Sequence, residues 1–365
     1  MFAFTYFAWN NAFFSASYEP LPPPPAPVNA TNAMDEVLRL IYGPMLQPIT
    51  AANFTDEDGD VYQLPGPPRF TKPLGKRVLI LDIDSRPLDG PGQIMNKDKM
   101  EWHDARSLTA GMLSHYMFAK IHGYDYKFIR APDYPDRWGT WVKVPMMKEA
   151  LKTHDFVAFM DSDVMFHYPH IPLEWLMNYW NITAENLVAM SIDPDEAQNY
   201  DTRGNRYVNT GFVIAQQSAR TQEMYKAWAE CPSDTRYTDC ARWGFEWAHE
   251  QAAFGNHIRY DFDRPEDIKV LPCVEANGAP EAAGRGGCKG AFVRHFWVDK
   301  QLPLKALSDQ VMQYFVPRMH EHYIEQSPNH IVDAKGFKIV GAELVALTEE
   351  EKAAVKEPQN QKEVP

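Results

Sequence analysis

The sequence predicts an α/β fold in which a mostly parallel, Rossmann-like sheet is covered by helices on both faces. Short apolar runs alternate along the chain with segments of helical spacing, which is typical of repeated β-α-β units. The runs at 78–81 and 156–160 are almost continuously apolar, as in strands that are buried on both faces. A length of 365 residues fits one large domain with tails.

The regular part of the chain begins near residue 77 with the strand at 78–81. Leu108, Met112 and Tyr116 then follow with the spacing of a helix that ends at Gly123. A strand at 126–129 follows, and then a helix that Thr140 caps and in which Val144, Met147 and Leu151 share one face. The same reasoning predicts the later elements, which are, in order, a strand at 156–160, a helix at 173–179, strands at 187–191 and 207–215, a helix at 218–229, ordered segments at 267–272 and 291–297, and a helix at 309–325.

The two ends of the chain differ in composition from its middle. The first 14 residues are rich in Phe, Ala, Tyr and Trp but short for a membrane span, so a membrane anchor and a flexible tail are both open. Residues 20–27 form a proline-rich spacer. Residues 28–75, with one helix at 34–41, belong to a stem or to packing at the domain edge. We therefore predict a tail and stem over 1–75, a catalytic domain over 76–345, and a charged tail over 346–365 that frays after about residue 347.

Charge argues against a nucleic-acid partner. The chain has 36 Lys and Arg against 49 Asp and Glu, a net charge of −13, and no basic stripe. An anionic ligand would therefore need a metal ion or a few placed cations.

The cysteines and glycosylation sequons favour an oxidising, secretory compartment, with the Golgi lumen as the expected location. The cysteines have no C-x-x-C spacing, which argues against structural zinc, and they allow two disulfides in any of three pairings. The cysteines are Cys231, Cys240, Cys273 and Cys288, and the sequons begin at Asn29, Asn53 and Asn181. The oligomeric state does not follow from the sequence.

Paired aspartates mark the predicted site. The D-x-D pattern occurs six times, but only Asp82/Asp84 and Asp161/Asp163 directly follow a buried-strand pattern. Ligands of open α/β sheets bind at the carboxyl ends of strands. Two carboxylates at such an end can share a divalent cation, which can in turn hold a diphosphate. Asp161-Ser162-Asp163 therefore favours a glycosyltransferase that uses a nucleotide-sugar donor.

Several blocks of sequence share an order along the chain, at residues 141–148, 159–166, 208–212, 227–228, 250–251 and 292–296. These blocks, collinear over roughly residues 77–302, resemble the galactosyl-, mannosyl- and xyloglucan xylosyltransferase family, whose members are retaining enzymes with the GT-A fold. One departure lies after His295, where the family usually carries Gly-Cys-Lys. This chain keeps the spacing of Lys300 and lacks the glycine.

The resemblance implies roles for the residues in these blocks. Asp161, Asp163 and His295 would bind Mn²⁺, although a lone histidine is more commonly structural. Lys300 would neutralise the diphosphate. Glu250 and Gln251 would lie beside the donor sugar and the reacting carbon. The remaining predicted ligand contacts are Asn209, Thr210 and Gly211 at the sugar, and Ser85, Arg86, Lys143 and Ser162 at the nucleotide and phosphates.

The predicted reaction moves a sugar from UDP-galactose, GDP-mannose or UDP-xylose to a hydroxyl of a glycan or polysaccharide acceptor, with retention. Retention would come from front-face attack or from a covalent intermediate on Glu250. One alternative is a protein of the same fold that binds sugars without turnover. Another is a phosphatase of the haloacid dehalogenase type using Asp82 and Asp84, although Arg86 stands where that motif needs Thr or Val.

Overall fold

The computed structural model describes residues 30–278, 287–331, 334–341 and 343–354. Its contacts divide the chain into two units, Met1–Gln310 and Val311–Pro365. The N-terminal tail, the proline-rich segment at 20–27 and the sequon at Asn29 lie outside the described residues. Among the residues described, no helix has both the length and the apolar character needed to span a bilayer.

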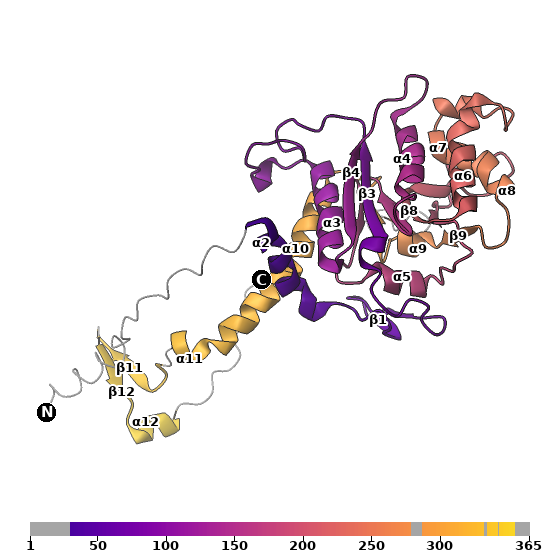
Figure 1. Ribbon diagram of the computed structural model, residues 1–365. Coiled ribbons are helices and arrows are strands. Elements are labelled where there is room, and N and C mark those ends of the chain that lie inside the picture. The colour runs from indigo at the N-terminus through magenta and orange to yellow at the C-terminus, as the bar shows by residue number, and fades with distance from the viewer. Residues whose placement is uncertain (1–29, 279–286, 332–333, 342, 355–365) are drawn as a thin grey trace. The chain divides into compact units, whose positions relative to one another are not determined.

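A six-stranded sheet forms the centre of the first unit, in the order β4-β3-β5-β8-β7-β9 (Figure 1). β8 is antiparallel to both of its neighbours, and the other three pairings are parallel. The beginning of β8 therefore lies at the same edge as the ends of β5 and β7. This confirms the predicted mostly parallel sheet. The strands are β3 (Val78–Asp84), β4 (Asp125–Arg130), β5 (Phe156–Met160), β7 (Val188–Ile192), β8 (Val208–Gln216) and β9 (Ile268–Leu271).

Helices cover both faces of this sheet because its central strands are apolar on both sides (Figure 1). Leu79 and Val157 belong to one core cluster, and Ile80 and Ala158 belong to the other. Side chains alternate between the faces of a strand, so neighbouring residues enter different cores. The first cluster packs against α4 (Lys143–Ala150) and α6 (Ala219–Glu230), and the second against α3 (Ser107–His122) and α5 (Leu173–Tyr179).

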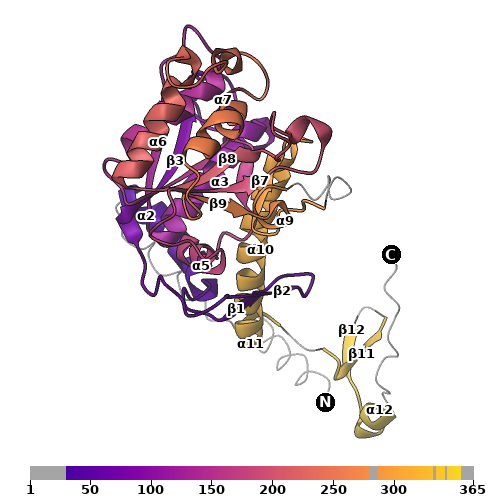
Figure 2. The same ribbon diagram turned by 90° about the vertical axis from the view of Figure 1, so that its right-hand side faces the viewer.

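A short antiparallel pair lies beside the end of β5. β6 (Val164–Phe166) pairs with β10 (Val293–His295), and His295 lies opposite Val164. This pairing brings a late segment of the chain next to Asp163. In Figure 2, α9 (Cys273–Ala276), which precedes β10 in the chain, is seen near β7 and β9.

Residues 46–74 pack at the edge of the domain, which was one of the two interpretations of this region. Phe54 enters the second core cluster. The indole of Trp175 donates a hydrogen bond to the carbonyl of Ala51 at 2.9 Å, and the amide of Leu74 donates to Glu174 at 2.6 Å. The helix α2 spans Ala30–Tyr42, and the hairpin strands are β1 (Asn53–Thr55) and β2 (Val61–Gln63).

Several boundaries differ from the prediction. Thr140 lies inside a 3-10 turn, Gly139–Val142, and caps no helix because its hydroxyl donates to Glu250. α10 (Leu302–Glu325) begins before residue 309. The expectation of fraying after residue 347 was wrong for 349–354, since Thr348 and Glu351 form a reciprocal capping box at the start of α12. The other elements are α7 (His249–Ala253), α8 (Arg259–Asp261), α11 (Ser327–His330), β11 (Phe337–Val340) and β12 (Glu343–Ala346).

The four cysteines form one of the three pairings that the sequence allows. Cys231 is bonded to Cys240, and Cys273 is bonded to Cys288. Each disulfide closes a short loop, and all four residues are buried.

Candidate active site

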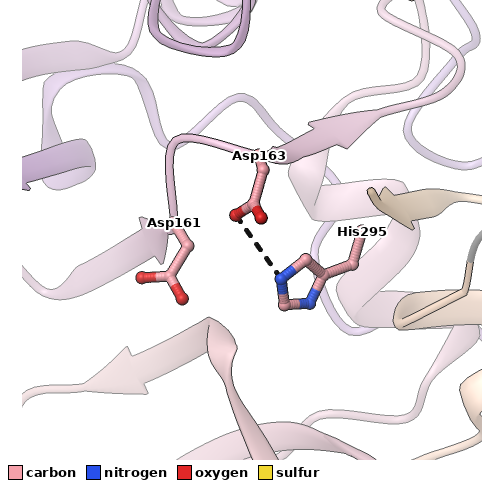
Figure 3. Close-up of side chains that lie close together, drawn as sticks. All are labelled: Asp161, Asp163 and His295. Carbon is pink, nitrogen blue, oxygen red and sulfur yellow. Dashed lines mark ion pairs between the residues drawn. The ribbon is translucent and has the colours of Figure 1, made fainter. Parts of the chain in front are cut away.

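Three potential metal ligands meet beyond the end of β5. Asp161 follows β5, Asp163 precedes β6, and His295 ends β10, as Figure 3 shows. One ligand atom from each residue lies within 4.8 Å of the others, and the Nε2 atom of His295 is 3.5 Å from Oδ1 of Asp163. Two carboxylates and an imidazole are suitable ligands for a divalent ion such as Mn²⁺.

Glycine at position 211 leaves the space that this group of ligands needs. A Cβ atom there would lie 2.6 Å from Cε1 of His295 and 3.1 Å from Oδ2 of Asp161. The carbonyl of Gly211 accepts a hydrogen bond from the amide of Asp161 at 2.7 Å. β8 thus approaches the turn through its backbone, and the three side chains present fit a bound metal ion.

A second glycine allows α3 to pack directly on the aspartate turn. A Cβ atom at Gly111 would lie 1.9 Å from the carbonyl oxygen of Ser162. The turn is closed by the amide of Val164, which donates to the carbonyl of Asp161 at 2.8 Å. The position of both carboxylates therefore depends on close backbone packing against α3.

Asn277 orients the imidazole of His295. Its Oδ1 atom lies 2.8 Å from Nδ1 of His295, and its Nδ2 atom donates to Asp193 at 3.3 Å. The donation to Asp193 identifies Oδ1 as the acceptor, so Nδ1 of His295 carries a hydrogen and Nε2 is the ring atom that faces Asp163. Outer partners of this kind determine the tautomer of a ligating histidine. Sequence reasoning missed Asn277, because an isolated asparagine carries no signal.

Charge keeps Asp163 ionised. Burial raises the pKa of its carboxyl, but His295 and Lys300 lower it by more, so the pKa lies well below its usual range. The Nζ atom of Lys300 is 3.0 Å from Oδ2 of Asp163, and the lysine side chain is largely exposed at the rim. Asp163 is therefore in the protonation state that a metal ligand needs, with a cation beside it.

A buried cation joins Asp161 to Glu250. The Nζ atom of Lys143 lies 2.9 Å from Asp161 and 3.2 Å from Glu250. Burial lowers the pKa of Lys143, but the two carboxylates raise it above its ordinary value. Burial has the opposite effect on Glu250 and raises the pKa of its carboxyl, but Lys143 and Thr140 lower that pKa by more, so it lies below its ordinary value. Both oxygens of Glu250 are engaged, one by Thr140 and the other by Lys143 and by Thr210 at 3.0 Å.

Asp193 anchors the other side of the site. It accepts hydrogen bonds from Gln251 at 2.7 Å and from Asn209 at 2.9 Å. Burial raises the pKa of Asp193 to about 6, although the bond from Asn209 acts against this. Gln251 also accepts from the amide of Thr210 at 3.1 Å. Sequence reasoning did not single out Asp193, although it follows the strand predicted at 187–191 by two residues, a signal that could have identified it.

All the predicted site residues line one or both of two adjoining cavities, and Thr140, Lys143 and Asp161 line both. One cavity has a volume of about 550 Å³ and the other about 300 Å³. We call them the larger and the smaller cavity. The predicted residues are Ser85, Arg86, Ser162, Asp163 and Lys300 in the larger, and Asn209, Thr210, Gly211, Glu250, Gln251 and His295 in the smaller.

In the second aspartate pair, Asp82 is enclosed instead, while Asp84 lines the larger cavity. Asp82 is buried and accepts hydrogen bonds from Tyr126 at 2.7 Å and from His115 at 2.8 Å. Asp84 forms an ion pair with Arg86 at 2.6 Å. A phosphatase nucleophile must reach its substrate, so this arrangement does not support the phosphatase alternative.

Three comparisons relate the chain to known proteins. A comparison with curated protein sequences gives no match. Among solved structures, a glycosyltransferase involved in the glycosylation of the major capsid of PBCV-1 is similar at 13% identity and a TM-score of 0.45, over 63% of this chain and 98% of that chain. Mouse xyloside xylosyltransferase 1 is similar at 11% identity and a TM-score of 0.35, over 62% and 99%. Residues 139–339, more than half of the chain, match the family described as nucleotide-diphospho-sugar transferase. The chain therefore belongs to the nucleotide-diphospho-sugar transferases and is a glycosyltransferase.

Proposed function

We propose that this glycosyltransferase uses a divalent metal, Mn²⁺, to move a sugar with retention from a nucleotide-sugar donor to a hydroxyl of a glycan. The observation that carries the proposal is the meeting of Asp161, Asp163 and His295 within 4.8 Å, next to both cavities. A bound metal would act as a Lewis acid that offsets charge on the departing diphosphate. The sequence blocks described above support the galactosyl-, mannosyl- and xyloglucan xylosyltransferase family within this class.

The larger cavity suits the nucleotide and its phosphates. It is lined by Arg86 and Lys300, and its side chains Ser85 and Ser162 carry hydroxyl groups. Lys300 is largely exposed beside Asp163, and its long side chain would reach a phosphate oxygen as a point charge. Arg86 forms an ion pair with Asp84, and this contact holds its guanidinium in place at the wall of the larger cavity.

The smaller cavity suits the donor sugar, and its hydrogen bonds favour front-face attack. Both carboxylate oxygens of Glu250 are engaged by Thr140, Thr210 and Lys143, which lowers the nucleophilicity of this carboxylate. In the front-face route, a bond from the acceptor oxygen to the anomeric carbon forms as the carbon–phosphate oxygen bond breaks on the same side. The departing phosphate oxygen takes the proton of the acceptor hydroxyl. Glu250 and Gln251 then orient the sugar through the polar network.

Donor hydrolysis tests this proposal. We expect Mn²⁺-dependent release of nucleoside diphosphate from UDP-galactose, GDP-mannose or UDP-xylose, abolished by EDTA. Asp163→Asn should reduce the rate by about 10²- to 10³-fold, the size of effect seen when one electrostatic contact to a departing anion is lost. Asp263→Asn is the matched control, because Asp263 is exposed and belongs to another D-x-D pattern.

The alternatives predict other results. Calorimetric binding of a donor without any hydrolysis would favour the sugar-binding protein that lacks turnover. Hydrolysis that is unchanged by both EDTA and Asp163→Asn would contradict the metal site.

We further propose that the enzyme works in the secretory pathway, in the Golgi lumen, and that its N-terminal segment anchors it there. The two disulfides and the exposed sequon residues Asn53 and Asn181 support this location. The test is the electrophoretic mobility of the protein expressed through a secretory pathway, before and after removal of N-glycans. If removing N-glycans does not change the mobility, glycosylation is absent. If the double variant Asn53→Gln/Asn181→Gln shows the same change in mobility as the wild type, neither of these two positions is glycosylated.

A further inference from the structure

A third cavity lies next to the larger one and has no role in the proposed reaction. Its volume is about 370 Å³, and Lys300 lines both cavities. The residues at the start of α3, Arg106, Ser107 and Thr109, form part of its wall together with the apolar Leu108 and Met112. We call this space the α3 cavity.

The charge of the α3 cavity is opposite to that of the chain. Arg106 and Lys300 line it, and no Asp or Glu is among its lining residues in the described part of the chain. The whole chain has a net charge of −13. Lys300 is shared with Asp163 at 3.0 Å, whereas Arg106 has no acid beside it among the described residues of the cavity wall. A hollow lined by cations and by no acid, in such a protein, favours a negatively charged ligand.

The helix end in this cavity has free donors. α3 is 16 residues long and begins at Ser107, and the residue before it, Arg106, makes no side-chain capping hydrogen bond. No acidic residue lies in its first turn. The first amides of a helix have no partner within the helix, and the helix dipole is positive at this end. Such an end favours an anion when the surroundings leave room for one.

An unpartnered hydroxyl is a second, independent observation. Ser107 is only 8% exposed, and its Oγ atom has no hydrogen-bond partner among the described residues. A buried polar group without a partner destabilises a fold, so such groups commonly meet a ligand or water. Because Ser107 lines the cavity, a rotation about its Cα–Cβ bond would bring the hydroxyl to an acceptor bound there.

We propose that the α3 cavity binds an oxyanion carried by the acceptor glycan, either the carboxylate of a uronic acid or a phosphate ester. The amides of the first turn, Ser107, Arg106 and Lys300 would hold the anion, while Leu108 and Met112 would contact the sugar ring. Sharing Lys300 with the larger cavity places the anion close to the reacting groups. The inference rests on the proposed function, because it assigns this anion to the acceptor of that reaction.

Calorimetric titration of the full chain tests the inference with three matched probes. Methyl β-D-glucuronide and glucose 6-phosphate carry the two oxyanions, and methyl β-D-glucoside is the neutral control. We expect at least one acid to bind about tenfold more tightly than the glucoside, as expected for hydrogen bonds to a charged group. Whichever acid binds identifies the source of the anion. Equal affinity for all three probes, or no binding, would overturn the inference.

Variants then locate the binding. Arg106→Gln and Ser107→Asp should each remove most of the preference for the acid. Ser107→Asp is the sharper variant, because a carboxylate in the first turn is compatible with the helix dipole and repels the anion. Thermal unfolding of each variant shows whether it is folded. Arg264→Gln is the matched control, because Arg264 is exposed and does not line the cavity. An unchanged preference in both test variants would place the anion elsewhere and overturn the proposal.

Donor hydrolysis separates this inference from the proposed function. Arg106 and Ser107 line neither the larger nor the smaller cavity, so both variants should hydrolyse the donor at the normal rate. If the wild type hydrolyses the donor and binds no acid preferentially, only the inference fails. If it binds the acid through Ser107 and hydrolyses no donor, the proposed function fails, and with it the assignment of the anion to an acceptor.

Discussion

The two aspartate pairs at the ends of neighbouring strands differ in their surroundings. Asp82 and Asp84 lie within β3, whereas Asp161 and Asp163 lie beyond the end of β5. β3 and β5 are parallel neighbours, so both pairs are at the same edge of the sheet. Asp82 is enclosed between β4 and α3, while Asp161 lines two cavities.

The difference shows that the place where a strand ends decides what a carboxylate can do. Within a strand, neighbours on both sides supply donors, and Asp82 uses them fully through His115 and Tyr126. Beyond the strand, the turn leaves one side open for a ligand, so Asp161 and Asp163 are partnered by cations and an imidazole around free space. The same sequence pattern therefore stabilises the fold in one place and forms the candidate metal site in the other.

The largest expected effect compares Asp161→Asn with Asp82→Asn. Asp161→Asn should reduce donor hydrolysis by about 10²- to 10³-fold, because a charged ligand is lost from the site. Asp82→Asn should instead destabilise the fold by about 3 kcal/mol, since it leaves a buried His115 without its charged partner. Steady-state kinetics and urea unfolding measure the two effects. Equal loss of activity per folded molecule in both variants would remove the distinction between the pairs.

A smaller effect is expected at the residue that orients the imidazole. Asn277→Ala should weaken Mn²⁺ binding by about 10- to 100-fold, the usual effect of losing an outer partner of a ligating histidine. The rate at saturating Mn²⁺ should change much less, because Asn277 does not line either cavity. Metal titrations of activity and calorimetry check this. A change in rate with unchanged metal affinity would contradict the orienting role.

Helix α3 contacts both pairs, and Gly111→Ala perturbs only one of them. The new methyl group would meet the carbonyl of Ser162 at 1.9 Å, so either the helix or the turn must move. We expect a loss of about 1 to 3 kcal/mol in unfolding free energy, typical of overpacking, together with weaker metal binding. Gly66→Ala is the control, since nothing lies within 4 Å of its added atom. Wild-type metal affinity in Gly111→Ala would show that the turn does not depend on this packing.

The smallest effect is a pH dependence of stability that arises from the buried pair of His115 and Asp82. Burial lowers the pKa of His115, but Asp82 and the carbonyl of Val164 raise it above its ordinary value overall. A raised folded-state pKa stabilises the fold fully below the unfolded value of about 6.5, and this contribution is lost as pH rises through the folded pKa. Urea unfolding across this range should show stability falling with rising pH, and less so in Asp82→Asn. An identical slope in both proteins would disprove the link.

Local patterns predicted the central elements well. The strand at 156–160 and the helix at 173–179 have the bounds expected for them, because a buried strand and an amphipathic segment show their period along the chain. The hairpin of β11 and β12 was not predicted. Its strands are mostly exposed, so they lack the apolar signal on which the prediction depends.

The sequence by itself determined that an acidic turn follows a buried strand, and it indicated the class of enzyme through the blocks around that turn. Only the tertiary structure decided which distant groups surround the turn. The reversed direction of β8 brings Gly211 to it, the pairing of β6 with β10 brings His295, and packing between loops brings Asn277 and Asp193. Periodicity is a property of neighbouring residues, whereas strand direction, register and enclosure arise from contacts between segments that are far apart in the chain.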